Sequence, residues 1–338
     1  MIREDLREKR LFFDGGMGTL LQEKGLKAGE LPEIWNLEHS EEVISIHQAY
    51  IEAGSDIILT NTFGANALKF HDGVYSLEEI TKTAVAHGKE AVRRSAGGRN
   101  VYVALDVGPT GKLLKPMGDL AFEEAYEAFR EVMQYGEDEI KAAVLAAKEN
   151  TNLPVFVTAV FDERKKLLTG ADVPAFVSLL EGLRVDALGI NCGMGPEQMI
   201  PILEELQRYS STPVIVKPNA GLPKQRDGET VFDVEPDAFA QTMRKIAGSG
   251  AAVIGGCCGT TPEHIRAMTA VCLEIPYEPA GKKNLTMVSS YGKTVIFGEE
   301  SKIIGERINP TGKKKFKQAL VERDMDYILR EGIRQEDN

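Results

Sequence analysis

The feature that most constrains the fold is an alternation of short β-rich runs with stretches of helical period. Parallel neighbouring strands need a crossover segment between them, so this alternation is typical of βα units. We expect strands at residues 11–14, 56–62, 101–107, 154–160, 186–191, 213–217 and 251–255. Amphipathic helices are expected at residues 41–53, 77–94, 122–133, 140–149, 173–183, 196–209 and 236–247.

These units predict an α/β fold of the TIM type, a (βα)8 barrel, with one strand unaccounted for. The gap lies where helical segments 122–133 and 140–149 are separated by the polar residues 134–139 alone. We therefore place the missing fourth strand near 134–139. We favour residues absent from the sequence over a true deletion, because a barrel that lost a strand would expose two edges.

The barrel is expected to span residues 1–277. Residues 278–300 begin with a segment that contains Pro279 and Gly281, which predicts a linker. Residues 301–338 are then expected to be the truncated start of a second barrel, with a strand at 303–305 and one helix over 313–332.

Composition excludes several classes of protein. The formal net charge of -11 argues against nucleic acid or an anionic membrane as a partner. No apolar run approaches the roughly 20 residues that span a bilayer. The charged N-terminus is unlike a signal peptide. We expect a cytoplasmic protein.

Polar, glycine-rich clusters follow the expected strands, at residues 14–19, 60–64, 106–111, 191–193, 217–221 and 255–262. In a βα barrel the functional face lies at the carboxyl ends of the strands. Thr261 and Pro262 also predict a helix whose N-terminus points at this rim. The histidines do not follow strand ends, and we expect them on exposed helices or loops: His39, His47, His71, His87 and His264.

Three of the four cysteines, Cys192, Cys257 and Cys258, fall at this rim. Three thiolates with an open fourth position are typical of a catalytic zinc site. The alternative is that Cys192 fills the core while the cysteine pair packs a glycine-rich turn. Spacing leaves both interpretations open, because no CxxC motif is present. Cys272, in an apolar helix end, is predicted to fill the core.

Four motifs together resemble the homocysteine S-methyltransferase family: DGGMGT at 14–19, TNTFGAN at 60–66, GINC at 189–192 and GGCCGTTPEH at 255–264. The resemblance runs in order over about residues 9 to 272. It implies a barrel in which Cys192, Cys257 and Cys258 are the catalytic residues and hold zinc. In that family zinc binds the sulfur of L-homocysteine as a thiolate, which attacks an electrophilic methyl group.

The resemblance also implies substrate contacts. Asp14, with the backbone that follows it, is implied to hold the amino-acid end of homocysteine. Asn219, in the segment KPNAG, is implied to be a placeholder fourth zinc ligand, although it could instead only shape its turn. The implied substrate-binding residues are Asp14, Gly15, Gly16, Met17, Asn61, Thr62 and Asn219. The family's fourth-strand glutamate has no counterpart in this sequence.

The segment IIGERINPTG at 303–312 resembles the start of the pterin-binding barrel that follows the homocysteine module in cobalamin-dependent members. Its matching residues are Glu306, Arg307 and Asn309. This implies methylcobalamin, bound by a module absent from this chain, as the methyl donor. It also implies 5-methyltetrahydrofolate, bound by the following domain, as the ultimate donor, and methionine as the product.

Three other interpretations stay open. The first is a cobalamin-independent homocysteine methyltransferase. The second is a barrel aldolase or lyase in which rim aspartates act as bases and the cysteines are incidental. The third is a scaffold with a structural zinc ion.

Overall fold

In the part of residues 1–295 that the structure describes, seven strands pair in parallel. In the computed structural model they are β1 (Leu11–Phe12), β2 (Ile57–Leu59), β3 (Tyr102–Ala104), β4 (Phe156–Ala159), β5 (Ala187–Asn191), β6 (Val214–Lys217) and β9 (Val253–Ile254). Backbone pairing gives the order β1-β9-β6-β5-β4, and β2 pairs with β3. A parallel bridge between Phe13 and Ile57 joins β1 to β2. The seven expected strands are confirmed, with shorter bounds.

The structure describes residues 1–338 apart from 28, 71–73, 116–117, 136–139, 227–228, 291, 299, 305–307 and 337–338. These residues form two compact units, Met1–Val295 and Ile296–Asn338. Within the described part, none of the helices has the length and apolar character that a membrane span requires.

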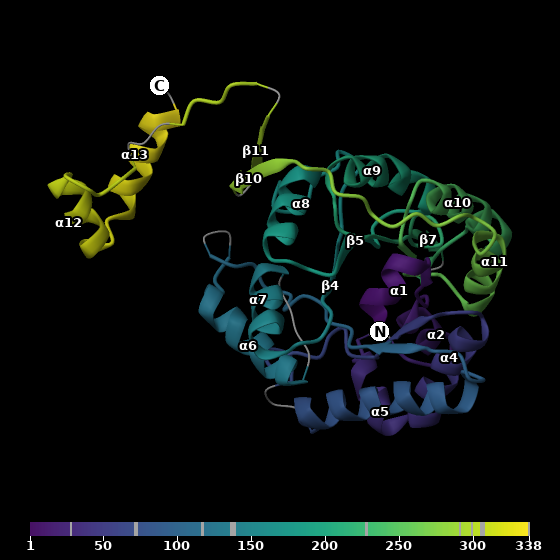
Figure 1. Cartoon of the computed structure of the whole chain (residues 1–338). Helices are drawn as coiled ribbons and strands as arrows, with labels where there is room; N and C mark the ends of the chain where they lie inside the picture. Colours follow the sequence, from purple (N-terminus) through teal and green to yellow (C-terminus); the bar gives the residue numbers. More distant parts are fainter. Residues whose placement is uncertain are drawn as a thin grey trace. The chain divides into compact units, whose positions relative to one another are not determined.

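Helices surround the strands of the first unit on their outer side (Figure 1). The helix predictions are confirmed to within about two residues, the usual uncertainty of helix ends. The helices are α4 (Ser40–Glu52), α5 (Leu77–Ser95), α6 (Phe122–Tyr135), α7 (Ile140–Asn150), α8 (Val173–Gly182), α9 (Pro196–Tyr209), α10 (Pro236–Gly248) and α11 (Pro262–Cys272).

The run of strands has its two ends at β3 and β4, where a fourth strand was expected. There the chain passes from α6 to α7, and among the described residues none between β3 and β4 forms a strand. Residues 136–139 lie outside the described part. The expectation that residues are absent from the sequence at this point stays a prediction. Leu120, Ala125, Phe129 and Ala146 form a separate core beneath this helix pair.

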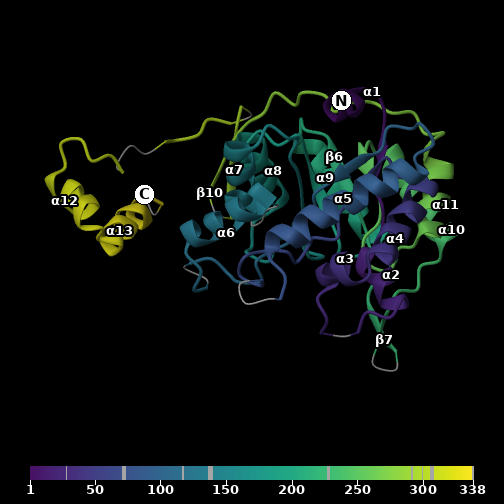
Figure 2. The ribbon, with the colours of Figure 1, turned by 90° about the horizontal axis from the view of Figure 1, so that it is seen from below.

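Several short elements were not predicted. They are α1 (Ile2–Glu8), α2 (Met17–Glu23), a 3-10 turn (Pro32–Ile34), α3 (Trp35–Glu38) and the antiparallel pair β7 (Lys224–Arg226) and β8 (Glu229–Val231). Figure 2 shows α1 at one end of the strands and α2, α3 and β7 at the other. Since α2 follows β1 and β7 follows β6, the second end is the carboxyl-terminal rim.

Strand and helix side chains between these layers form the core. Ile57, Ile215 and Val253 are fully buried, as is Cys272, so the core-filling prediction for Cys272 is confirmed. The expectation of exposed histidines is wrong for three of them, because His47, His87 and His264 are buried. Their helices place them on inward faces, which strand-end reasoning could not detect. His71 lies outside the described residues.

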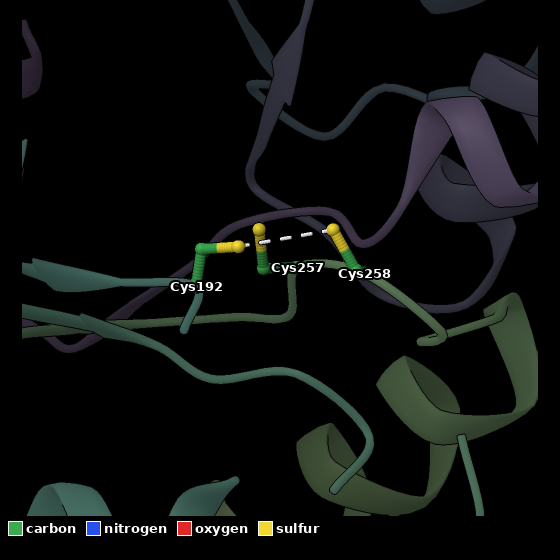
Figure 3. Close-up of side chains that lie close together, drawn as sticks. All are labelled: Cys192, Cys257 and Cys258. Carbon is green, nitrogen blue, oxygen red and sulfur yellow. Dashed lines mark hydrogen bonds between the residues drawn. The ribbon is translucent and has the colours of Figure 1, made fainter. Parts of the chain in front are cut away.

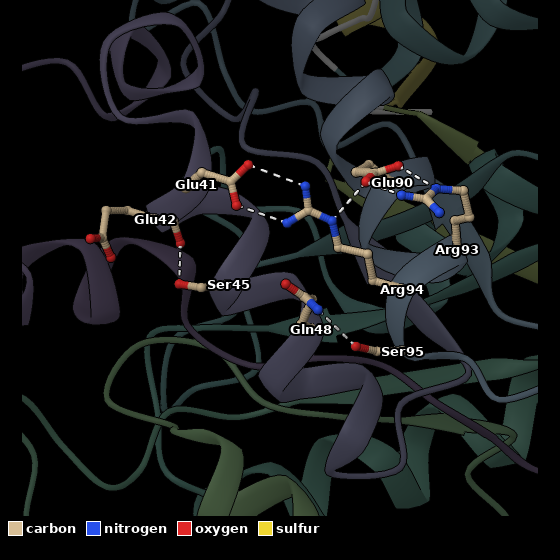
Figure 4. A network of polar contacts seen from close by, with 8 residues as sticks. All are labelled: Glu41, Glu42, Ser45, Gln48, Glu90, Arg93, Arg94 and Ser95. Carbon is tan, nitrogen blue, oxygen red and sulfur yellow. Dashed lines mark hydrogen bonds and ion pairs between the residues drawn. The ribbon is translucent and has the colours of Figure 1, made fainter.

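Ion pairs on the outer surface link α4 and α5 (Figure 4). Arg94 donates to Glu41 at 2.8 and 3.1 Å and to Glu90 at 2.6 Å. Gln48 donates to Ser95 at 3.0 Å beneath them. Exposed pairs of this kind contribute little individually, so the apolar contact between α4 and α5 dominates their association.

The expected linker 278–300 contains two paired strands, β10 (Thr286–Ser290) and β11 (Lys293–Phe297). In the second unit, the single helix expected over 313–332 is wrong. It is divided into α12 (Lys314–Glu322) and α13 (Met325–Glu336) at Arg323, whose φ is 55°. Ile303 and Ile304 form no strand, and residue 305 lies outside the described part.

Candidate metal centre

Three cysteine side chains converge at the carboxyl-terminal rim (Figure 3). Cys192 follows β5, whereas Cys257 and Cys258 follow β9. Their three sulfur atoms all lie within 4.8 Å of one another, and the Sγ atoms of Cys192 and Cys258 are 3.8 Å apart. All three residues are partly buried. The structure therefore brings together the three cysteines that the strand-end argument selected.

The backbone turns sharply to aim these thiols at one point. Cys192 has a φ of 55°, in the left-handed region that few non-glycine residues adopt, and Gly193 follows with a φ of 71°. The Cys192 N–H donates to the carbonyl of Lys217 at 3.0 Å. The Cys257 N–H donates to the carbonyl of Pro218 at 2.8 Å. These hydrogen bonds, donated to the last residue of β6 and to the residue after it, thus hold the turns that carry the cysteines.

The thiols interact strongly with one another. Hydrogen bonds from Cys257 and Cys258 hold the pKa of Cys192 far below its ordinary value. The thiolate of Cys192 in turn raises the pKa of Cys257, and it raises the pKa of Cys258 to about 11. An ionised Cys192 thus opposes the ionisation of the other two thiols. A bound divalent ion would remove this opposition and favour three thiolates.

The glycines after β1 are needed for close packing against the cysteine turn. A Cβ on Gly15 would lie 2.6 Å from the Thr260 hydroxyl, and one on Gly16 would lie 2.9 Å from the Cys257 carbonyl. The Gly16 N–H donates to the Thr260 carbonyl at 3.2 Å. Gly15 and Gly16 therefore let the turn after β1 approach the metal centre closely. The Gly16 N–H has its hydrogen-bond acceptor within the protein.

Helix α11 begins beside the cysteine turn. Thr261 is its N-cap and Pro262 its first residue, as predicted. His264 completes the cap, because its Nδ1 accepts from the Thr261 N–H at 3.2 Å while its Nε2 lies 2.8 Å from the Val234 carbonyl. This contact accounts for the buried His264.

Asp14 lies under the rim, opposite the lysine that ends β6. Its Oδ2 accepts a hydrogen bond from the Leu59 N–H at 2.7 Å, whereas its Oδ1 is buried and has no hydrogen-bond partner. The Nζ of Lys217 is 3.8 Å from that Oδ1. Burial raises the pKa of Asp14 to about 7, although the charge of Lys217 opposes the rise.

Asn219 borders the metal centre. Its Oδ1 accepts a hydrogen bond from the Cys258 N–H at 3.1 Å. Its side chain also contributes to lowering the pKa of Cys192. Asn219 therefore lies beside two of the three cysteines, where both its expected roles, placeholder ligand and turn former, remain predictions.

Other expected substrate-binding side chains are occupied within the protein. Asn61 donates to the Pro32 carbonyl at 2.7 Å, and Thr62 donates to the Asp106 carbonyl at 2.6 Å. Met17 is the first residue of α2. Their roles in substrate binding stay predictions.

The residues expected to begin the second barrel are only partly described. Glu306 and Arg307 lie outside the described residues. Asn309 accepts a hydrogen bond from the Thr311 N–H at 2.9 Å, which shapes the following turn.

Two charged rim residues were missed as site candidates. Lys217 and Asp106 were each included only as the first residue of a polar, glycine-rich cluster. Both could have been found from position, because each lies at or just after the carboxyl end of a strand. Burial raises the pKa of Asp106, and Lys217 opposes that rise.

The class of protein follows from comparison with known sequences. The homocysteine S-methyltransferase family model matches residues 11–272, which contain the seven strands and the three cysteines. The chain belongs to the homocysteine S-methyltransferase family.

Particular relatives narrow the comparison. The chain is 31% identical over 365 residues to proteins named methionine synthase from Mycobacterium leprae and Mycobacterium tuberculosis, with 96% of this chain covered. It spans 30% of the length of each. The matched length exceeds the 338 residues of this chain, so those relatives have residues without a counterpart here.

A solved structure shows a similar fold. The Escherichia coli homocysteine methyltransferase MmuM, in its metallated form, aligns with a TM-score of 0.64 at 23% identity. The alignment covers 78% of this chain and 96% of that one. An oxidised form of the same protein aligns equally well.

Proposed function

We propose that this chain methylates the sulfur of homocysteine, which it binds through a zinc ion held by Cys192, Cys257 and Cys258. The observation that carries the proposal is the convergence of three thiols within 4.8 Å at the rim. With zinc–sulfur bonds of about 2.3 Å, two sulfurs of a tetrahedral site lie about 3.8 Å apart. The separation of 3.8 Å between Cys192 and Cys258 fits that value.

The donor set also fits a catalytic rather than a closed structural site. Three protein ligands leave one position of a tetrahedral ion for a substrate. Zinc bound there supplies a Lewis acid that lowers the pKa of a substrate thiol, so that the sulfur is nucleophilic at neutral pH. Asn219, beside Cys192 and Cys258, is proposed to occupy the fourth position until homocysteine replaces it.

The chain's own residues are proposed to position the amino-acid end of the substrate. The unpartnered Oδ1 of Asp14 suits an α-ammonium group, because a buried carboxylate oxygen without a donor is unfavourable. The Gly256 N–H donates to the backbone carbonyl of Asp14 at 2.9 Å, so the residue that carries this carboxylate is held directly against the cysteine turn. Ammonium and sulfur would thereby be fixed relative to each other.

The proposed methyl donor is methylcobalamin, carried by a domain outside this chain, as in a cobalamin-dependent methionine synthase. The likeness to mycobacterial methionine synthases over 96% of the chain supports this proposal. We propose domains at 1–277, 278–300 and 301–338, the last being the start of a barrel that binds methyltetrahydrofolate. Within the first, a (βα)8 barrel lacking its fourth strand accounts for the order of the seven strands.

The test measures bound zinc and methyl transfer in parallel. Cys192→Ser, Cys257→Ser and Cys258→Ser should each lose zinc and lose transfer from free methylcobalamin to homocysteine. Cys272→Ser, which alters a buried thiol away from the rim, is the matched control and should keep both. Full zinc and full activity in the three rim variants would overturn the proposal. Transfer from S-methylmethionine but not from methylcobalamin would instead identify a cobalamin-independent enzyme.

A further inference from the structure

Lys217 is a buried charge that the proposed reaction does not yet use. It ends β6 after three buried apolar residues, and it is only 7% exposed. Lysine is almost never buried at this level unless an opposite charge accompanies it. The side chain therefore needs a reason to point into the rim.

The contacts of Lys217 are incomplete. Its Nζ lies 3.8 Å from Asp14 Oδ1 and 4.4 Å from the ring centroid of Phe13. The first distance exceeds that of a hydrogen bond, and the second is a cation–π contact. An ammonium group has three hydrogens to donate, and no acceptor for them is found among the described residues. The facing Oδ1 of Asp14 likewise lacks a donor.

A second carboxylate belongs to the same group of charges. Asp106 follows β3, and Lys217 is the charge that most stabilises its ionised form. Asp14, Asp106 and Lys217 thus offer two carboxyl groups and one ammonium group at one rim. An α-amino acid carries the complementary pair, an ammonium and a carboxylate.

This group of charges adjoins the metal centre through the backbone. The Lys217 carbonyl accepts from the Cys192 N–H at 3.0 Å, and the Asp14 carbonyl accepts from the Gly256 N–H at 2.9 Å. A ligand whose sulfur is bound by a metal ion that the three cysteines hold would therefore have its other end close to Lys217 and Asp14.

We infer that Lys217 binds the α-carboxylate of the thiol amino acid, while Asp14 and Asp106 face its α-ammonium group. This inference rests on the proposed function and adds a specificity-determining residue to it. The opposing explanation is that Lys217 is only a counter-ion for the carboxylates of Asp14 and Asp106. The two explanations differ in one respect. Only a Lys217 that binds the α-carboxylate makes the affinity depend on whether the ligand has a carboxylate.

The experiment compares the affinity of the protein for homocysteine with its affinity for 3-aminopropanethiol, the same molecule without its carboxylate. Both are measured by calorimetric titration of the whole chain, after its metal content has been determined. The natural protein should bind homocysteine at least tenfold more tightly than 3-aminopropanethiol, as expected for a charge-assisted hydrogen bond to the carboxylate. Lys217→Met should weaken the binding of homocysteine by about that factor and leave the binding of 3-aminopropanethiol unchanged. Lys245→Met, which removes an exposed lysine paired with Glu197, is the matched control and should keep the natural preference.

Each outcome separates the two claims. If the natural protein binds neither thiol, the proposed function fails. If it binds both equally, or if Lys217→Met keeps the tenfold preference, Lys217 is a counter-ion and the inference is overturned. Should Lys217→Met not fold, Lys217→Arg keeps the charge and Lys217→Gln removes it. If Lys217→Arg keeps the preference for homocysteine and Lys217→Gln loses it, Lys217 binds the carboxylate. If both variants keep the preference, the inference is contradicted.

Discussion

Asp14 is expected to make the stability of the protein depend on pH in an unusual direction. Burial raises its pKa from 3.8 to about 7 in the folded protein. In the unfolded chain the carboxyl group returns to its ordinary pKa. Between these two values the folded protein keeps a proton that the unfolded chain has released. The free energy of unfolding should therefore fall as pH rises through this window.

The size of the effect follows from the shift. One pKa unit corresponds to about 1.4 kcal/mol. For pKa values of about 7 folded and 3.8 unfolded, the contribution of Asp14 changes by roughly 2 to 3 kcal/mol between pH 5 and pH 8. The variant Asp14→Asn removes the titrating group but keeps an oxygen for the Leu59 N–H, which donates at 2.7 Å. It should gain stability relative to the natural protein as pH rises.

The assay is chemical denaturation of both proteins at several pH values from 5 to 8. The difference between their free energies of unfolding should change by roughly 2 to 3 kcal/mol over this range. Asp162→Asn is the control, because hydrogen bonding lowers the pKa of that exposed carboxylate. Parallel curves for the natural protein and Asp14→Asn would refute the argument that Asp14 is buried with a raised pKa.

Two further predictions concern packing. Arg10→Ala should lower the free energy of unfolding by about 3 kcal/mol or more. The reason is that the buried guanidinium donates to five backbone carbonyls, including that of Ala247 at 2.7 Å. A decrease of less than about 1 kcal/mol, measured by urea denaturation, would contradict this prediction. Gly189→Ala should separate β5 from β6 and lower both soluble yield and bound zinc, because its Cβ would lie 2.0 Å from the Ile215 carbonyl oxygen. Gly182→Ala, where a Cβ meets nothing within 4 Å, is the control and should change neither quantity.

Much of the fold was predictable from local pattern. Each strand is a short apolar run followed by glycine or polar residues, and each long helix has an apolar face, so both periodicities can be read without knowing the partner segments. Placing Cys192, Cys257 and Cys258 after strands was enough to predict that they share a rim, because parallel strands end at the same edge. The division of the C-terminal helix at Arg323 was missed, since an arginine in a left-handed conformation has no signal in sequence.

What the sequence determined by itself is therefore the order of elements and the three cysteines at strand ends. Only the tertiary structure decided which charges face one another. Lys217 and Asp14 are 203 positions apart in the chain, and their approach to 3.8 Å depends on the order in which β1, β9 and β6 pair. The burial of His47 and His87, and the packing of Gly15 against Thr260, arise in the same way. Periodicity records which face of an element is apolar, whereas contacts between distant elements are set by how those faces assemble.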